Sequence, residues 1–187
     1  METIGVLSLQ GSFAEHLQAL KKIKNIKNMP VKTVAELDAV DRLILPGGES
    51  TTMSKILNIT GLAAEIRRRI LAGMPVWGTC AGLILLAKEL DVGLPHLAVM
   101  DMQVRRNAYG SQLDSFTVQK LIPKISSNPL NMVFIRAPQI VSISGTTEVL
   151  AEYDGKIVAA QQNRMLATTF HPELTDDLDV YNYFLKL

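Results

Sequence analysis

The sequence predicts an α/β fold in which a mixed, mostly parallel sheet lies between helices in three layers. The first half alternates short apolar runs with amphipathic helical patterns, an order typical of parallel strands covered by helices on both faces. The second half has more strand patterns, two of them joined by the hairpin signal Asp154-Gly155. The 187 residues contain no repeat, linker or low-complexity tract, so we expect one domain over residues 1–187.

The elements of the first half follow from its periodicity. Residues 4–9 form an apolar run closed by Gln10-Gly11, as a buried strand would. Ser12 can cap the helix expected next, whose apolar residues recur at helical spacing. The other expected elements are strands at residues 31–34, 43–45 and 75–77, a helix from about residue 51 to 71 that Gly61 interrupts, and a helix over residues 83–90.

The elements of the second half are mainly strands. Alternating or apolar stretches rich in β-branched and aromatic residues predict them, and a final amphipathic stretch predicts a closing helix. The expected strands are residues 102–105, 116–119, 132–135, 149–153, 157–161 and 165–170, and the helix covers residues 176–187.

The composition narrows the class of protein. A net charge of +1 gives no reason to expect nucleic acid as a partner. The single cysteine can form neither an internal disulfide nor a thiolate zinc site, so we expect a reducing, cytoplasmic compartment and no metal. The sequence has no apolar run long enough to span a membrane and does not begin like a secretory signal. No membrane association is therefore expected.

Cys80 is the first candidate catalytic residue. It lies in a Gly-x-Cys-x-Gly pattern between an expected strand and an expected helix, the arrangement of a nucleophile at a strained turn. The turn places the thiol at a helix N-terminus, which favours the thiolate, and leaves the N–H of Ala81 free to bind an oxyanion. A lone cysteine is otherwise often a small core residue, and it is the surrounding pattern that favours catalysis.

A thiol nucleophile needs a base and a group that orients the base. His171 directly follows an expected strand, and Glu173 lies two positions on, across a proline that can hold both side chains on one side of an extended turn. The same three residues could form an ordinary polar loop. Of the other histidines, His16 is expected to be a surface or packing residue, and His96 lies in a connecting segment.

A glycine pair marks the expected oxyanion site. Gly47 and Gly48 come straight after a strand, and consecutive glycines let backbone N–H groups turn towards a bound oxygen. Glu49 and Ser50 follow, where they can meet the charged groups of a small substrate. Alternatively, this segment is a loop breaker followed by a helix cap at Ser50.

With these residues identified, the sequence resembles the class I (triad) glutamine amidotransferases, whose fold is three-layered and flavodoxin-like. Among them it is most similar to the glutaminase subunits of pyridoxal 5′-phosphate synthases. Pro-Gly-Gly-Glu-Ser-Thr-Thr and Phe-Ile-Arg-Ala-Pro are the motifs specific to that group. The segments that carry the resemblance are residues 5–16, 45–52, 78–87, 105–110, 134–138 and 169–174.

The resemblance implies hydrolysis of L-glutamine to L-glutamate and ammonia, with Cys80 as nucleophile, His171 as proton carrier and Glu173 as its orienter. It implies no cofactor in this chain. The ammonia would pass to a separate (β/α)₈-barrel synthase subunit in a hetero-oligomeric complex that makes pyridoxal 5′-phosphate, and docking on the side of Gln10 and Gly11 would assemble the oxyanion hole. The positions that bind glutamine in the family are Gly48, Glu49, Ser50, Arg106, Ile135 and Arg136.

One departure from the family pattern bears on the predicted site, and two alternative functions are open. Ser111 stands where the family commonly has arginine, a change that could weaken ion pairing near Arg106. A glutaminase subunit for another synthase, such as imidazole glycerol phosphate synthase, would share the segments around Cys80 and His171, but the Phe-Ile-Arg-Ala-Pro motif argues against it. A non-catalytic binding module of the same fold is the other alternative, and such proteins usually lack the cysteine or histidine.

Overall fold

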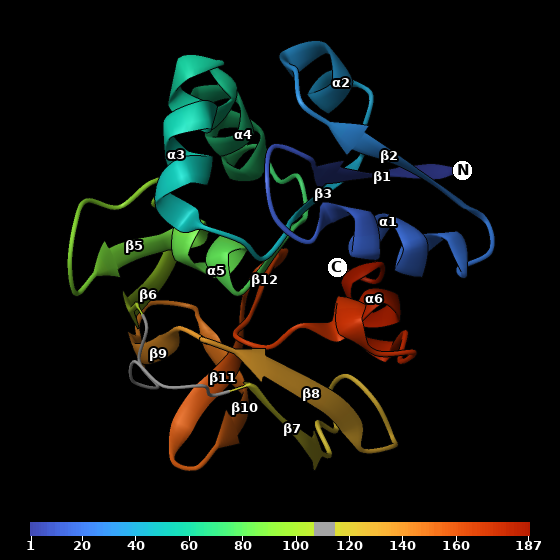
Figure 1. Ribbon diagram of the computed structural model, residues 1–187, viewed down its shortest axis with the longest axis vertical. Helices are drawn as coiled ribbons and strands as arrows, with labels where there is room; N and C mark the ends of the chain where they lie inside the picture. The colour runs from blue at the N-terminus through green and yellow to red at the C-terminus, as the bar shows by residue number, and fades with distance from the viewer. Residues whose placement is uncertain (107–114) are drawn as a thin grey trace.

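A computed structural model describes residues 1–106 and 115–187 of the chain (Figure 1). The strands are β1 (Glu2–Leu7), β2 (Ile26–Val31), β3 (Arg42–Leu45), β4 (Val76–Thr79), β5 (Ala87–Leu90), β6 (Met100–Arg105), β7 (Ser115–Lys120), β8 (Leu130–Ile135), β9 (Gln139–Ile143), β10 (Glu148–Tyr153), β11 (Lys156–Gln162) and β12 (Met165–Thr168). The helices are α1 (Phe13–Lys21), α2 (Val34–Asp38), α3 (Ser50–Ile59), α4 (Leu62–Leu71), α5 (Ala81–Leu86), the 3₁₀ turn η1 (Pro172–Leu174) and α6 (Asp179–Phe184).

The main sheet joins both halves of the chain. Its strand order is β2-β1-β3-β4-β12-β11-β9-β6-β5, with β10 paired to β11. The pairs from β2 to β12 are parallel, whereas β11 pairs antiparallel with β12 and β9. Strand β12 therefore returns from the end of the chain to lie beside β4, with Thr168 opposite Thr79. This pairing brings the segments that follow β4 and β12 to the same edge of the sheet.

Helices cover both faces of the sheet, as the sequence predicts. One apolar cluster packs α2, α3, α4 and α5 against the sheet, and a second packs α1 and α6 against its other face, together with the β7–β8 hairpin. Trp77 of β4 is fully buried in the second cluster. Among the described residues, no helix is both long and apolar enough to cross a membrane. The mostly parallel α/β architecture is confirmed.

Several element boundaries differ from the expectation. The strand expected at residues 31–34 is wrong, because β2 ends at Val31, Thr33 is the N-cap of α2 and Val34 is its first residue. Thr33 Oγ1 accepts a hydrogen bond from Glu36 N, and the Glu36 carboxylate accepts one from Thr33 N, which makes a capping box. The Thr-x-x-Glu pattern in the sequence is the signal for this cap, and it outweighs the short apolar run that suggested a strand.

The expected helix over residues 83–90 is also wrong at its end. Helix α5 stops at Leu86, and the chain continues as β5, which pairs with β6 at the sheet edge. Strand β9 was not expected, and the closing helix is confined to α6. The errors at β5 and β9 share a cause: short apolar segments suit a strand or a helix equally well, and tertiary pairing decides between them.

Two glycines allow the turn between β4 and α5 to pack closely. A Cβ on Gly82 would lie 2.0 Å from the carbonyl oxygen of Leu45, and a Cβ on Gly78 would lie 2.5 Å from the carbonyl carbon of Gly82. These neighbours are backbone atoms that cannot move aside. The flanking glycines of the Gly-x-Cys-x-Gly pattern are therefore required by packing between β3, β4 and α5.

We predict that Gly82→Ala lowers the free energy of unfolding by about 2–3 kcal/mol, because the added methyl group collides with backbone. Gly93→Ala is the matched control. Gly93 has φ +91° but no atom within 4 Å of its Cβ position. Gly93→Ala should therefore lower the free energy of unfolding by roughly 1 kcal/mol, from backbone conformation alone. Urea denaturation of both variants measures the difference, and equal losses would contradict the packing account.

Candidate active site

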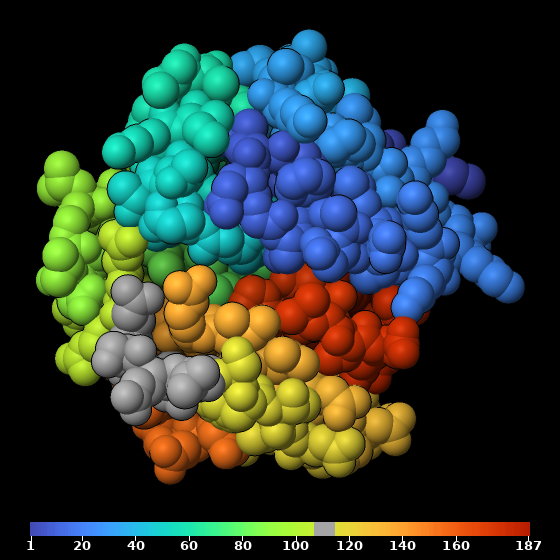
Figure 2. All heavy atoms as spheres, in the orientation of Figure 1, coloured from blue at the N-terminus to red at the C-terminus, as the bar shows by residue number. Residues whose placement is uncertain are grey.

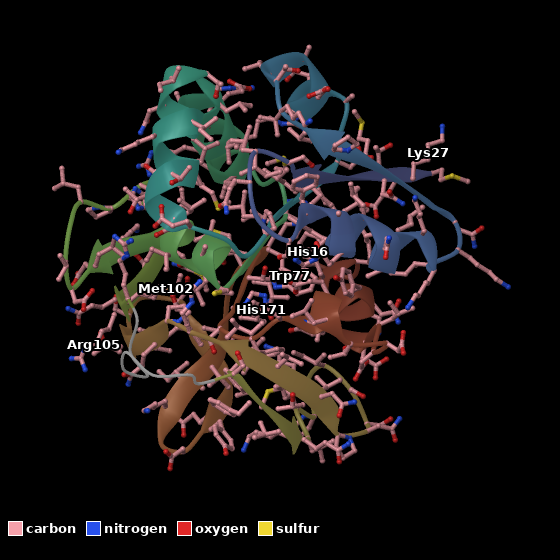
Figure 3. All side chains as sticks on the ribbon, viewed as in Figure 1. His16, Lys27, Trp77, Met102, Arg105 and His171 are labelled. Atoms are coloured by element: carbon pink, nitrogen blue, oxygen red, sulfur yellow. The ribbon has the colours of Figure 1, made fainter. Side chains whose placement is uncertain are left out.

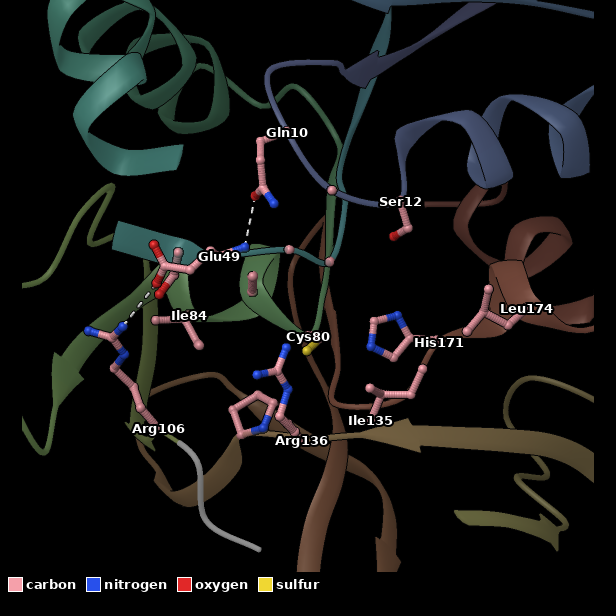
Figure 4. A pocket seen from close by; sticks show the side chains of 16 residues that line it. Gln10, Ser12, Glu49, Cys80, Ile84, Arg106, Ile135, Arg136, His171 and Leu174 are labelled. Atoms are coloured by element: carbon pink, nitrogen blue, oxygen red, sulfur yellow. Dashed lines mark hydrogen bonds and ion pairs between the residues drawn. The ribbon is translucent and has the colours of Figure 1, made fainter. Parts of the chain in front are cut away.

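A pocket opens where the ends of β3, β4 and β8 meet the segment after β12. Its volume is about 430 Å³. In the space-filling view the green segment of α5 lies recessed between the cyan and orange parts of the chain (Figure 2). Cys80, His171 and every other predicted site residue except Glu173 line the pocket (Figure 4). The lining residues are Gln10, Gly11, Ser12, Gly47, Gly48, Glu49, Ser50, Cys80, Ala81, Ile84, Arg106, Ile135, Arg136, Pro138, His171 and Leu174.

Cys80 occupies a strained turn at the start of α5. Its backbone has φ 49° and ψ −103°, outside the regions that non-glycine residues ordinarily adopt. A hydrogen bond of 2.9 Å from Cys80 N to Thr168 O ties the turn to β12. The N–H of Ala81 belongs to the first residue of α5, so the helix itself offers it no acceptor. The turn thus aims a thiol and a free donor into the same pocket.

The ring of His171 lies beside the sulfur of Cys80 (Figure 4). Its backbone N–H donates to Val133 O at 2.8 Å, which anchors the residue to β8. Its Nδ1 lies 2.7 Å from Oε1 of Glu173, and the hydroxyl of Ser12 donates to the same oxygen at 2.7 Å. The linking segment is a 3₁₀ turn rather than the extended turn expected. Glu173 is buried behind the histidine and does not line the pocket.

The titration of the His171–Glu173 pair is shifted in opposite directions. Burial by itself lowers the pKa of His171, but hydrogen bonds and charge interactions with Cys80 and Glu173 outweigh it and raise that pKa to about 10. Burial likewise raises the pKa of Glu173, but the neighbouring His16 and the bonds from His171 and Ser12 lower it to about 2. At neutral pH the pair is an imidazolium and a carboxylate.

Charged side chains of opposite sign stand at the rim of the pocket. Glu49 caps α3 by accepting hydrogen bonds from Thr51 N at 3.1 Å and Thr52 N at 2.7 Å, so the cap expected at Ser50 is in fact one residue earlier. Burial raises the pKa of Glu49, but these bonds lower it to about 2. Arg106 Nη2 lies 3.4 Å from Glu49 Oε1. A free amino acid carries one ammonium and one carboxylate group. The rim offers a carboxylate and a guanidinium group that can pair with them.

The glycine loop after β3 is clamped by the loop after β1. Gln10 Oε1 accepts a hydrogen bond from Glu49 N at 2.8 Å, and Ser12 N donates to Gly47 O at 3.0 Å. A Cβ on Gly11 would lie 1.8 Å from Gly47 O, and one on Gly47 would lie 2.5 Å from the His171 ring. The residues predicted for the oxyanion site and for the partner interface are therefore in direct contact.

Some features lie outside the sequence prediction. Ser12, Ile84, Pro138 and Leu174 also line the pocket. They lie within the segments that carry the family resemblance, but only three-dimensional packing shows that they belong to the pocket. Ser12 stands at the N-cap of α1, yet its hydroxyl bonds to Glu173 instead of the helix. The position of Ser111 lies outside the described residues. No cluster of side chains suited to a metal ion occurs in residues 1–106 and 115–187.

Comparison with solved structures defines the class of protein. A structure described as a glutamine amidotransferase superposes with a TM-score of 0.91 at 40% identity, covering 98% of this chain and 97% of that one. The structure of PurLQS from Thermotoga maritima superposes with a TM-score of 0.69 at 15% identity, over 100% and 99% of the two chains, a likeness of fold alone. The fold is that of the class I glutamine amidotransferases.

The family follows from the sequence comparisons. Residues 6–187 match the model of the SNO glutamine amidotransferase family, and the chain belongs to that family. It is 49% identical over 188 residues to pyridoxal 5′-phosphate synthase subunit PdxT of Ruminiclostridium cellulolyticum, covering 100% of both chains. It is 52% identical over 185 residues to the PdxT subunit of Caldanaerobacter subterraneus subsp. tengcongensis, covering 98% of each.

We predict that the His171 ring stays protonated at both nitrogens past pH 8, because its raised pKa extends the protonated form upwards. Long-range ¹H–¹⁵N spectra recorded from pH 5 to 11 measure this. Cys80→Ala removes one partner of the ring and should bring the titration to lower pH. Burial lowers the pKa of His96, so its neutral ring at pH 7 is the internal control. A His171 titration near 6.5 in both proteins would contradict the coupling.

Proposed function

We propose that this chain hydrolyses L-glutamine to L-glutamate and ammonia through Cys80, His171 and Glu173, as the glutaminase subunit of a pyridoxal 5′-phosphate synthase. The observation that carries the proposal is one pocket lined by both Cys80 and His171, with the buried carboxylate of Glu173 bonded to the far side of the His171 ring. The full-length similarity to PdxT subunits supports the choice of pathway.

The reaction divides into two acyl transfers. The Cys80 sulfur attacks the carbonyl carbon of the glutamine side-chain amide, and the N–H of Ala81 with the Gly47–Gly48 loop stabilises the negative oxygen. The carbon–nitrogen bond then breaks, and His171 gives its proton to the leaving ammonia. This leaves a γ-glutamyl thioester. Water attacks the thioester while His171 takes up a proton, and the sulfur departs as glutamate forms.

The rim of the pocket orients the substrate. The anionic Glu49 can meet the α-ammonium group, and the guanidinium groups of Arg106 and Arg136 can meet the α-carboxylate. Ser50, Ile135 and Gly48 complete the binding site that the family resemblance implies. The charged anchors hold the α-ammonium and α-carboxylate groups of glutamine at the rim. Its side chain can then reach along the pocket to Cys80.

The ammonia is delivered to a separate synthase subunit, for which we propose the (β/α)₈-barrel partner. Docking on the face of Gln10 and Gly11 would act directly on the oxyanion site, since Gln10 holds Glu49 N and Gly11 lies against Gly47. The partner can thereby limit glutamine hydrolysis to the assembled complex. We propose that residues 1–187 form one domain, which carries out glutamine hydrolysis and docks to the partner.

We predict that Cys80→Ala abolishes ammonia release by the complex, a loss of at least about 10³-fold, without weakening the association of this chain with the synthase. Coupled glutamate detection and sedimentation of the mixed proteins measure the two effects. In the wild-type chain, a chloroketone analogue of glutamine should alkylate Cys80, with the adduct located by mass spectrometry.

Unchanged turnover in Cys80→Ala would refute the role of Cys80 as nucleophile. It would favour the alternative that the chain is a non-catalytic binding module. The same assay tests the pathway. Activation by the imidazole glycerol phosphate synthase partner, and not by the pyridoxal 5′-phosphate synthase partner, would overturn the choice of pathway.

A further inference from the structure

One oxygen of the buried carboxylate has no hydrogen bond. Oε1 of Glu173 receives both His171 and Ser12, whereas Oε2 is buried without a hydrogen-bond partner among the described residues. A charged oxygen in the interior is unfavourable unless a donor faces it.

The ring of His16 on α1 lies close to this oxygen. Its Nε2 lies 3.5 Å from Glu173 Oε2 and 3.2 Å from Thr79 Oγ1. The ring is fully buried and lies edge-on to Trp77, with centroids 5.6 Å apart. The side-chain view places His16 and Trp77 next to each other in the interior, close to His171 (Figure 3). His16 does not line the substrate pocket.

The other ring nitrogen decides which tautomer His16 adopts. The hydroxyl of Tyr181 on α6 lies 2.8 Å from Nδ1. Burial raises the pKa of Tyr181, so the phenol keeps its proton, and burial lowers the pKa of His16, so the ring is neutral. A neutral imidazole carries one N–H. If the phenol donates to Nδ1, that hydrogen is on Nε2 and points towards Thr79 and Glu173.

We propose that His16 and Tyr181 are positioning residues of the glutaminase reaction: the Tyr181 hydroxyl fixes the Nε2–H tautomer of His16, which donates towards Glu173 Oε2. This rests on the proposed function. The catalytic carboxylate is then held by a donor at each oxygen, so that Oε1 stays aimed at the His171 ring. The opposite tautomer would point a lone pair at the carboxylate and repel it.

The groups that face this network are few. Glu173 is surrounded by His171 from its own segment, by Ser12 and His16 from the α1 side and by Tyr181 from α6. Beyond these, Glu15 acts on His16 through its charge. Cys80 reaches the network only through His171.

The tautomer itself is the most direct test and needs no activity. Long-range ¹H–¹⁵N spectra of the full chain at pH 7 should show His16 neutral, with the hydrogen on Nε2. Tyr181→Phe removes only the hydroxyl and should let the Nδ1–H form appear. An imidazolium or an Nδ1–H ring in the wild-type chain would overturn the proposal.

Steady-state kinetics in the complex with the synthase subunit test the functional role. Tyr181→Phe should lower kcat about tenfold, with KM unchanged because neither residue touches the pocket. The control is Tyr183→Phe, which removes a hydroxyl from the same helix, but one that donates to Gln161. We expect wild-type kcat from the control. Equal kcat in both variants would overturn the positioning role.

Replacements of His16 separate the donor from the packing. His16→Gln can place an N–H near the position of Nε2 and should retain most of kcat, whereas His16→Leu should lose it by about tenfold or more. Equal losses in the two variants, with folding intact, would reduce His16 to a packing residue. If the wild-type complex releases no ammonia from glutamine, the proposed function fails, whereas the tautomer is still decided by the spectra.

Discussion

The hydrogen bond between His171 Nδ1 and the buried carboxylate of Glu173 is the interaction on which the site depends. At 2.7 Å it joins two groups only two residues apart, yet the second donor to the same carboxylate oxygen, the hydroxyl of Ser12, comes from the opposite end of the chain. A buried carboxylate without such donors would hold its proton and could not stabilise an imidazolium. The bond from Ser12 therefore makes the N-terminal segment a structural part of the proposed site, whose candidate reactive groups come later in the sequence.

The parallel pairing of β4 with β12 makes this arrangement possible. It sets the turn that carries Cys80 beside the segment that carries His171, and the hydrogen bond from Cys80 N to Thr168 O fixes their register. Gly82 lets α5 approach Leu45 closely enough for the turn to form. The strain at Cys80 is thus held by neighbours on both sides, which is the usual condition for a strained residue to persist at a functional site.

Much of this was predictable because it depends on local chemistry. Glycines around Cys80 and the His-Pro-Glu segment follow from the needs of a nucleophile and a base, and the alternation of strands and helices predicts the sheet. What could not be predicted depends on long-range packing. Nothing in the residues near Ser12 or His16 indicates that they approach Glu173, because α1 meets the end of the chain only in the folded molecule. For the same reason the strand at β5 was mistaken for helix, and the Ser12 hydroxyl for a helix cap.

The central claim is that the charge of Glu173, acting through His171, makes the thiol of Cys80 reactive. The most direct test is kcat of Glu173→Gln in the complex with the synthase subunit, since this change keeps the shape of the side chain and removes its charge. By analogy with amide replacement of the orienting carboxylate in serine proteases, kcat should fall by about 10³–10⁴-fold with KM little changed. A folded Glu173→Gln chain that hydrolyses glutamine at near the wild-type rate would contradict the account.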